Sequence, residues 1–247
     1  MGKAENLDSS YQVEVADGWL KRLKDDILDP ETLRTVNHPF LRGLEAGTLP
    51  VERVRRYFSD LEWVTAGVSL YVAALASRGD RYNHALNERL IQNAYEECSH
   101  PFIHKKMMIA LGSTDAQAIY DGPEWVGYEA TDVAIQLRLA IKCCCYVEEY
   151  AIGFAGLAIG IESGAPRIFG RVADALIKHY GLSEDDVEWL RIHTGEVEIE
   201  HGNAGLRLLG TMISESDINS QNACRAIVKT LSSGFGTRLM DASMMES

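Results

Sequence analysis

Apolar residues recur every three to four positions along most of the chain, whereas strictly alternating runs are nearly absent. This period places apolar side chains on one face of an α-helix, so the pattern predicts an all-α protein. The polar residues 1–12 predict a frayed N-terminal segment. The helices expected from this pattern are 14–28, 50–79, 83–111, 129–163, 165–180, 183–212 and 217–239.

Local signals support several of these helix boundaries. Pro50 suits a first helical turn, and Ser183 can cap the helix that contains VEWL. Gly112 and Gly181 fall where helices are expected to end. The run AIGFAGLAIG also carries glycines three and four positions apart, at Gly153, Gly156 and Gly160. Close packing against another helix is the commoner reason for such a strip.

Length and composition predict a single helical domain over residues 1–247, long enough to bury a sizeable core and a cavity. The chain is 46% hydrophobic with only 6 prolines, and it shows no linker-like segment and no repeat of fixed period. No apolar run reaches the length of a membrane span, and the start of the chain lacks the pattern of a signal peptide. We therefore expect a cytoplasmic protein with no membrane partner.

Charge and cysteine usage narrow the partners further. A net charge of −12 argues against nucleic acid, because binding a phosphate backbone requires clustered Lys and Arg. Three of the 5 cysteines are consecutive, Cys143, Cys144 and Cys145, and on a helix they point in different directions. Apolar packing in a reducing compartment is therefore favoured over a thiolate metal site.

Two Glu-x-x-His pairs carry the clearest chemical signal. Glu97 and His100 lie in EECSHPFIH, and Glu198 and His201 lie in RIHTGEVEIEH. The spacing of three puts each carboxylate and imidazole on one helix face, within reach of one metal ion. Two such pairs, with single carboxylates from other helices, are typical of di-iron sites in helical bundles. A charged solvent-facing surface is the competing interpretation of either pair alone.

Single carboxylates supply further candidates. Glu162 lies among apolar and small residues, where an ionised carboxylate is costly unless a cation meets it, so we predict it as the ligand from a third helix. Glu148 and Glu149 are also available, and Glu148 lies on nearly the same ideal helix face; a charged surface patch is the competing interpretation. Asp60 and Glu62 precede an apolar run and are interpreted as substrate-side or surface groups.

His193 conflicts with a regular helix through RIHTGEVEIEH. On an ideal helix of about 100° per residue it shares a face with Glu196 and Glu200, and not with the second Glu-x-x-His pair. A single π-bulge at Thr194-Gly195 would shift the register and bring His193 to that pair. Otherwise His193 is an ordinary core or surface histidine.

Most of the chain resembles the haem-oxygenase-like superfamily, which includes the thiaminase-II (TenA) and PqqC proteins and the di-iron oxidases of the CADD and UndA type. The stretches that carry the resemblance are NHPFLRGLEAGTLPVERVRRYF (37–58), HPFIHKKMMIALG (100–112), GIESGAP (160–166) and the two ends of 182–209, LSEDDVEWLRIH and EHGNAGLRLL. The resemblance implies a bundle of about seven helices around a central metal site.

Carried over residue by residue, the resemblance implies the metal ligands Glu97, His100, Glu162, His193, Glu198 and His201. This chain departs from the family pattern in two places. The segment from His193 to Glu198 is one residue longer than the family motif. The first pair has the UndA-type spacing, whereas the CADD-type spacing would place the carboxylate at Asn93. His104 lies one turn beyond His100 and is expected either to contact the ligands from behind or to line the pocket.

The resemblance implies a non-haem di-iron oxidase or oxygenase that binds two Fe, loaded as Fe2+, and uses O2 as co-substrate. Its expected substrate is a small carboxylate or amino acid, oxidised by decarboxylation, C–C cleavage or N-oxygenation. An external electron donor and a homodimer are compatible with this expectation. Three alternatives remain open: a metal-free hydrolase of the TenA type with a nucleophile among Cys143–Cys145, a ferritin-like iron-handling bundle that uses Glu62 and Glu162, and a non-enzymatic binding protein.

Overall fold

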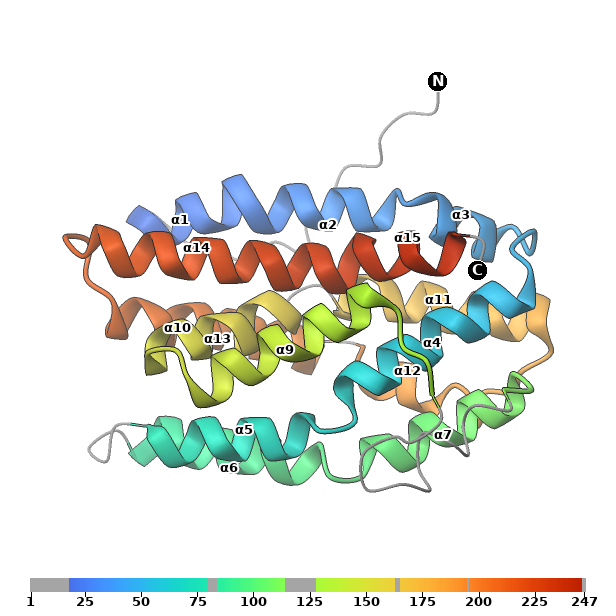
Figure 1. Ribbon diagram of the computed structural model, residues 1–247, viewed down its shortest axis with the longest axis horizontal. Coiled ribbons are helices and arrows are strands. Elements are labelled where there is room, and N and C mark those ends of the chain that lie inside the picture. The colour runs from blue at the N-terminus through green and yellow to red at the C-terminus, as the bar shows by residue number, and fades with distance from the viewer. Residues whose placement is uncertain (1–17, 80–83, 114–127, 163–164, 195, 246–247) are drawn as a thin grey trace.

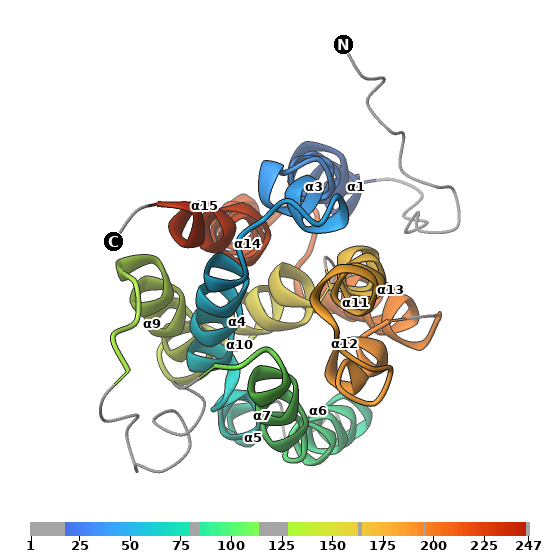
Figure 2. The same ribbon diagram turned by 90° about the vertical axis from the view of Figure 1, so that its right-hand side faces the viewer.

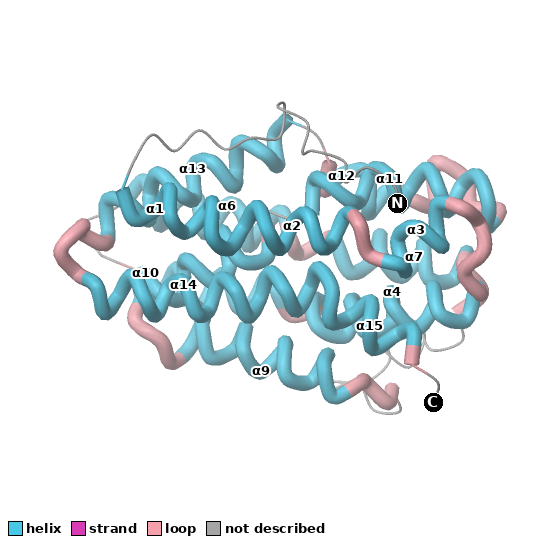
Figure 3. The backbone as a smooth tube through the Cα atoms, turned by 90° about the horizontal axis from the view of Figure 1, so that it is seen from above, coloured by secondary structure: helices cyan, strands magenta, loops and turns pink. Residues whose placement is uncertain are grey.

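The computed structural model describes residues 18–79, 84–113, 128–162, 165–194 and 196–245. Helices account for most of these residues, and the described ranges contain no strand (Figure 3). The all-α prediction is therefore confirmed. No helix in these ranges is both long and apolar enough to cross a membrane.

The α-helices have the following bounds: α1 Gly18–Leu23, α2 Asp29–Val36, α3 Pro39–Glu45, α4 Val51–Thr65, α5 Val68–Arg78, α6 His84–Glu96, α7 His100–Ala110, α9 Asp132–Tyr146, α10 Tyr150–Phe154, α11 Ala165–Tyr180, α12 Glu188–Ile192, α13 Glu196–Met212, α14 Ile218–Ser233 and α15 Leu239–Met244. Most of them run along the long axis of the molecule, so that α1 and α2 lie beside α14 and α15 (Figure 1). Viewed from the end, α10 lies near the centre, between α9 on one side and α13 on the other (Figure 2).

Three π-helical segments extend α-helices without interrupting them. They are η2 Lys24–Leu28 between α1 and α2, η3 Ala155–Ile161 after α10, and η4 Gly234–Arg238 between α14 and α15. In the first, the N–H of Asp29 bonds to the carbonyl of Lys24, five residues earlier, directly before Pro30. Pro30 has no N–H to donate, so a wide turn at this point lets the helix continue past it. This is why the first helix runs to Val36 rather than ending at 28 as predicted.

The bundle has more and shorter helices than the seven predicted, because four expected helices are interrupted. The expected helices 50–79, 83–111, 129–163 and 183–212 break at 66–67, 97–99, 147–149 and 193–194. Helix α3 was not predicted. The hydrophobic period continues across a short break when the helices before and after it bury the same side of the chain. The period alone therefore does not mark where a helix stops.

The glycine strip packs closely, as predicted. A Cβ added at Gly153 would overlap the carbonyl oxygen of Cys144 on α9, and one at Gly160 would lie 3.0 Å from the Cβ of Leu231 on α14. Small residues here bring α10 and η3 against both neighbours. This close approach packs η3 against α9, α13 and α14, and Glu162 follows directly after η3.

Candidate metal centre

A cavity of about 420 Å³ lies between the helices. Its walls come from η2, α2, α4, α5, the junction of α6 with α7, η3, α11, α12, α14 and η4. Most of the lining is apolar, for example Leu61, Val72, Leu157, Ile168, Phe169 and Phe235. All three π-segments contribute to this wall or border it, which agrees with the tendency of π-turns to occur at functional sites.

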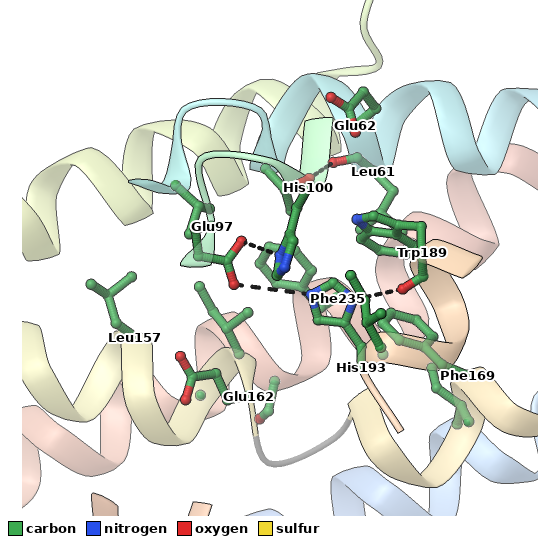
Figure 4. A pocket seen from close by; sticks show the side chains of 18 of the residues that line it. Leu61, Glu62, Glu97, His100, Leu157, Glu162, Phe169, Trp189, His193 and Phe235 are labelled. Atoms are coloured by element: carbon green, nitrogen blue, oxygen red, sulfur yellow. Dashed lines mark hydrogen bonds and ion pairs between the residues drawn. The ribbon is translucent and has the colours of Figure 1, made fainter. Parts of the chain in front are cut away.

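Glu97, His100 and His193 form a cluster on the cavity wall, shown in Figure 4. The Oε2 atom of Glu97 lies 2.8 Å from Nδ1 of His100, and its Oε1 atom lies 4.0 Å from Nε2 of His193. One ligand atom from each of the three residues lies within 4.8 Å of the others. The two histidine rings are in edge contact, with centroids 4.6 Å apart. Residues almost a hundred positions apart therefore meet at one point.

The first Glu-x-x-His pair spans a helix junction instead of lying within one helix as predicted. Helix α6 ends at Glu96, a turn follows, and α7 begins at His100. The N–H of Glu97 still bonds to the carbonyl of Asn93 at 2.9 Å, and Pro101 occupies the first turn of α7, where its missing N–H costs little. The turn therefore keeps Glu97 and His100 on the same side of the chain.

His193 directly follows the last residue of α12, and a hydrogen bond made by its side chain fixes the orientation of its ring. Its Nδ1 atom lies 2.7 Å from the carbonyl oxygen of Trp189, which can only accept, so Nδ1 donates and Nε2 keeps its lone pair toward Glu97. Burial lowers the pKa of His193, and the charge of Glu97 opposes that shift. The buried imidazole therefore favours the neutral form, which is the form that binds metal ions.

The backbone beyond His193 departs from α-helical bonding, as predicted, but not through a π-bulge. The N–H of Thr194 bonds to the carbonyl of Arg191, three residues earlier, and α13 starts anew at Glu196. Gly195 lies outside the described residues. The prediction of one continuous helix with a bulge is wrong, because a break redirects the chain and lets His193 meet Glu97, which follows α6, and His100 on α7.

Two further buried side chains support Trp189. His104 on α7 stacks on the Trp189 ring, with centroids 4.2 Å apart and 17° between the planes. Its Nδ1 atom pairs with Oε2 of Glu62 on α4, and both side chains are at most 2% exposed. The contacts therefore run from Glu62 through His104 and Trp189 to His193. Glu62 lines the cavity and is not a surface group, whereas His104 does not line the cavity and contacts Trp189 on its wall.

Of the remaining predicted ligands, the structure describes the side chain of Glu162 alone. Glu162 follows η3 and lines the same cavity (Figure 4). Its Oε1 atom accepts from Nδ2 of Asn93 at 3.5 Å. Glu162 is not among the atoms that meet around Glu97. The side chains of Glu198 and His201 lie outside the described residues, although the backbone of both belongs to α13.

The other candidate residues do not line the cavity. Asp60 is fully buried but accepts from the hydroxyl of Tyr128 and from the N–H and hydroxyl of Thr131, the N-cap of α9. Glu148 and Glu149 lie at the break after α9 and do not line the cavity. The cysteines are unpaired, and burial raises the pKa of Cys144 and of Cys145 to about 12. The packing interpretation of these thiols agrees with their surroundings.

Comparisons with known proteins identify the family of this chain. Residues 55–234 match the family model described as iron-containing redox enzyme. The chain belongs to this family. It is also 24% identical over 202 residues to a 4-aminobenzoate synthase of Nitrosomonas europaea, covering 77% of this chain and 78% of that protein.

Solved structures similar to this family member share its fold. A TenA homologue from Pseudomonas syringae superposes with a TM-score of 0.80 over 97% of this chain and 98% of the other, at 16% identity. A domain of unknown function with a heme oxygenase-like fold, from Shewanella denitrificans, gives 0.72 over 93% of each chain, at 14% identity. The haem-oxygenase-like fold expected from the sequence is confirmed.

The donor set of the cluster fits iron. One carboxylate and two imidazoles form the ligand set typical of non-haem Fe(II). Ligand atoms that lie about 2.1 Å from one ion are at most about 4.2 Å apart, so the 4.8 Å spread of the cluster requires only a small contraction. The Trp189 carbonyl supplies the outer hydrogen bond that metal-ligating histidines commonly make.

Sequence reasoning missed Trp189 and Glu31. Trp189 precedes His193 by four positions, the spacing at which a side chain can bond a backbone carbonyl, but that signal is too common to single it out. Glu31, on α2, is 3% exposed and lines the cavity. Its neighbours DPETLRTV are polar enough to predict a surface position.

Proposed function

We propose that this member of the iron-containing redox enzyme family is an O2-dependent non-haem di-iron oxidase or oxygenase that acts on a small carboxylate or amino acid. The observation that carries the proposal is the Glu97–His100–His193 cluster on the wall of a mostly apolar cavity. The cavity volume, about 420 Å³, falls in the range of small-molecule sites.

Iron bound at this cluster would supply the electrons and open coordination positions that O2 reduction requires. The protein's own residues then have three tasks. Glu97, His100 and His193 hold the ion, and the Trp189 carbonyl fixes which nitrogen of His193 faces it. Apolar side chains such as Phe169 and Phe235 keep water away from the bound substrate.

We assign the second iron position to Glu162, Glu198 and His201. Glu162 supports this assignment because its carboxylate lines the same cavity. The backbone of α13 supports it as well, because positions 198 and 201 are three apart on a continuous helix and so share a face. His193 belongs to the first position in this assignment.

The relative named 4-aminobenzoate synthase supports a biosynthetic role for a chain of this family. An enzyme that reduces O2 at iron requires electrons, so an external electron donor is part of the proposal. The competing proposal is a metal-free hydrolase, since TenA homologues share the fold. It requires a nucleophile in the cavity, and no cysteine is among the described residues of its lining.

Metal loading tests the proposal. The purified chain is loaded anaerobically with Fe(II), its iron content is measured, and its absorption and Mössbauer spectra are followed after rapid mixing with O2. We expect close to two irons per chain and an O2-dependent spectral change. A folded chain that retains no iron contradicts the proposal. Activity without iron that is lost in a Cys143→Ala variant would support the hydrolase instead.

A further inference from the structure

Glu31 is a buried carboxylate on the cavity wall that does not belong to the metal cluster. Its Oε1 atom accepts from Nη1 of Arg34 at 2.7 Å. Its Oε2 atom is fully buried and has no hydrogen-bond partner among the described residues. A buried carboxylate oxygen that accepts no hydrogen bond costs free energy, so such an oxygen on a cavity wall is suited to a donor supplied by a ligand.

The threonine hydroxyls of this wall already donate their hydrogens within their own helices, so they can only accept hydrogen bonds from a ligand. The hydroxyls of Thr32, Thr35 and Thr65 each donate to the carbonyl four residues earlier, at 2.7, 2.8 and 3.0 Å. All three residues line the cavity. A hydroxyl that has committed its hydrogen retains lone pairs, so each of these oxygens can accept from a ligand.

Glu31, Thr32 and Thr35 lie within little more than one turn of α2, with Glu31 and Thr35 one turn apart on the same face. This part of the wall therefore offers one charged acceptor and two neutral acceptors. A primary ammonium group carries three N–H donors and one positive charge. Among the described residues of the cavity wall none is Lys or Arg, the side chains that would hold a carboxylate away from the iron.

We propose that the cavity binds a molecule with a primary ammonium group, which Glu31 holds by a charge-assisted hydrogen bond while Thr32 and Thr35 accept its other hydrogens. The rest of the molecule extends along the apolar wall toward the metal cluster. The inference rests on the proposed function only in taking this amine to be the substrate, and it selects amines and amino acids over simple carboxylates.

Calorimetric titration with matched ligands tests the site. The full chain, both without added metal and loaded with Zn(II), is titrated with n-hexylamine, 1-hexanol and hexanoate, which differ only in the end group. We expect hexylamine to bind about tenfold or more tightly than the other two, the magnitude of a charge-assisted hydrogen bond. Glu31→Gln should weaken hexylamine by a similar factor and leave hexanol unchanged, and unchanged hexanol binding shows that the cavity remains intact.

Glu45→Gln is the matched control. Glu45 on α3 also pairs with an arginine, Arg171, but does not line the cavity, so this variant should bind hexylamine normally. Equal binding of the three ligands, or hexylamine binding that survives Glu31→Gln and falls with Glu162→Gln, overturns the inference. Loss of iron binding with an intact preference for hexylamine contradicts the proposed function and supports the amine site.

Discussion

The environment of His193 shows how one residue acquires a role that its local sequence does not determine. The stretch RIHTGEVEIEH offers it two faces of one helix, but α12 ends at Ile192 and α13 begins at Glu196. A break after α12 and a hydrogen bond to the Trp189 carbonyl turn the imidazole toward Glu97 instead. The histidine could be singled out from the sequence, whereas its contact with Glu97 depends on how distant segments pack together.

Replacing His193 should disable the first metal position. His193→Ala removes one of three ligands, so the affinity for Fe(II) or Co(II) should fall by more than the roughly 10- to 100-fold typical of outer hydrogen-bond partners. Anaerobic equilibrium dialysis measures the affinity. His179→Ala is the control, because His179 is exposed and lies outside the cavity. Unchanged affinity in His193→Ala would remove His193 from the site.

Glu162→Ala should abolish O2 consumption without unfolding the protein. The carboxylate lines the cavity, and its removal takes away a ligand while also removing a charge from a largely apolar setting. O2 uptake and the thermal unfolding midpoint separate these effects. Glu149→Ala, at an exposed position away from the cavity, should keep normal activity. Normal turnover of Glu162→Ala would refute its assignment as a ligand.

The buried thiols should make the fold sensitive to alkali. Burial raises the pKa of Cys144, Cys145 and Cys224 from 9.0 to about 12. The unfolded chain loses these protons first, so this contribution is complete below pH 9 and is lost as the pH rises toward 12. At pH 10 each thiol should lower the free energy of unfolding by about 1 kcal/mol.

Urea unfolding at pH 8 and at pH 10 measures that loss. Cys144→Ala should reduce the difference between the two pH values, because one buried thiol no longer titrates. Cys98→Ala removes an exposed thiol and keeps the three buried ones, so it should retain the wild-type loss. An identical loss in both variants would contradict the assignment to buried thiols.

Helices α4, α7 and α12 are linked by the contacts from Glu62 through His104 to Trp189. We expect Glu62→Gln to weaken metal binding although Glu62 is not a ligand. The neutral amide holds His104 less firmly, so Trp189 and His193 lose part of their orientation, at a cost of about 10- to 100-fold in affinity. Co(II) titration should show the weaker binding together with an altered d–d spectrum.

Asp60→Asn is the matched control for this test. Asp60 lies on α4 two residues before Glu62, is equally buried, and bonds to Tyr128 and Thr131 instead of the chain of contacts to His193. Both variants should lower the thermal midpoint, but only Glu62→Gln should change the Co(II) spectrum. An altered spectrum in both would show that loss of stability alone disturbs the site.

The hydrophobic period predicted the helices well and their interruptions poorly. It marks which face is buried, and that face continues across the turn at 97–99 and the break at 193–194. The positions of the π-helical segments could not be predicted from the sequence either. η2 accommodates Pro30, and η3 packs glycines against α9 and α14. Both causes involve backbone bonds or neighbouring helices that a single segment does not reveal.

The site as a whole depends on how the helices pack together. The Glu-x-x-His spacing identified the first pair, and the isolated carboxylate in GIESG identified Glu162 as a cavity residue. Neither signal could place Glu31 or Glu62 on the same cavity, because both lie in helices whose polar residues resemble a solvent-facing surface. Burial of a polar residue is a property of the assembled bundle, not of its own helix.

The packing of the helices also predicts that the two iron positions differ in their affinity for Fe(II). Ligand atoms of Glu97, His100 and His193 already lie within 4.8 Å of one another, so the first position requires little ordering. Glu162 lies apart from that cluster, so gathering it with two residues of α13 should cost more. Anaerobic Fe(II) titration should therefore resolve a tighter and a weaker site.

Variants of the two sets should remove the two sites separately. Glu97→Ala should eliminate the tighter site, and His201→Ala should eliminate the weaker one, because each replacement leaves the other ligand set intact. Glu196→Ala and Glu200→Ala are the controls, since both residues lie on α13 but at positions that do not share a face with 198 and 201 together. If these controls lose iron while His201→Ala keeps both sites, α13 presents its other face and the assignment of the second position is wrong. Two sites of equal affinity would mean that the preformed cluster gives the first position no advantage.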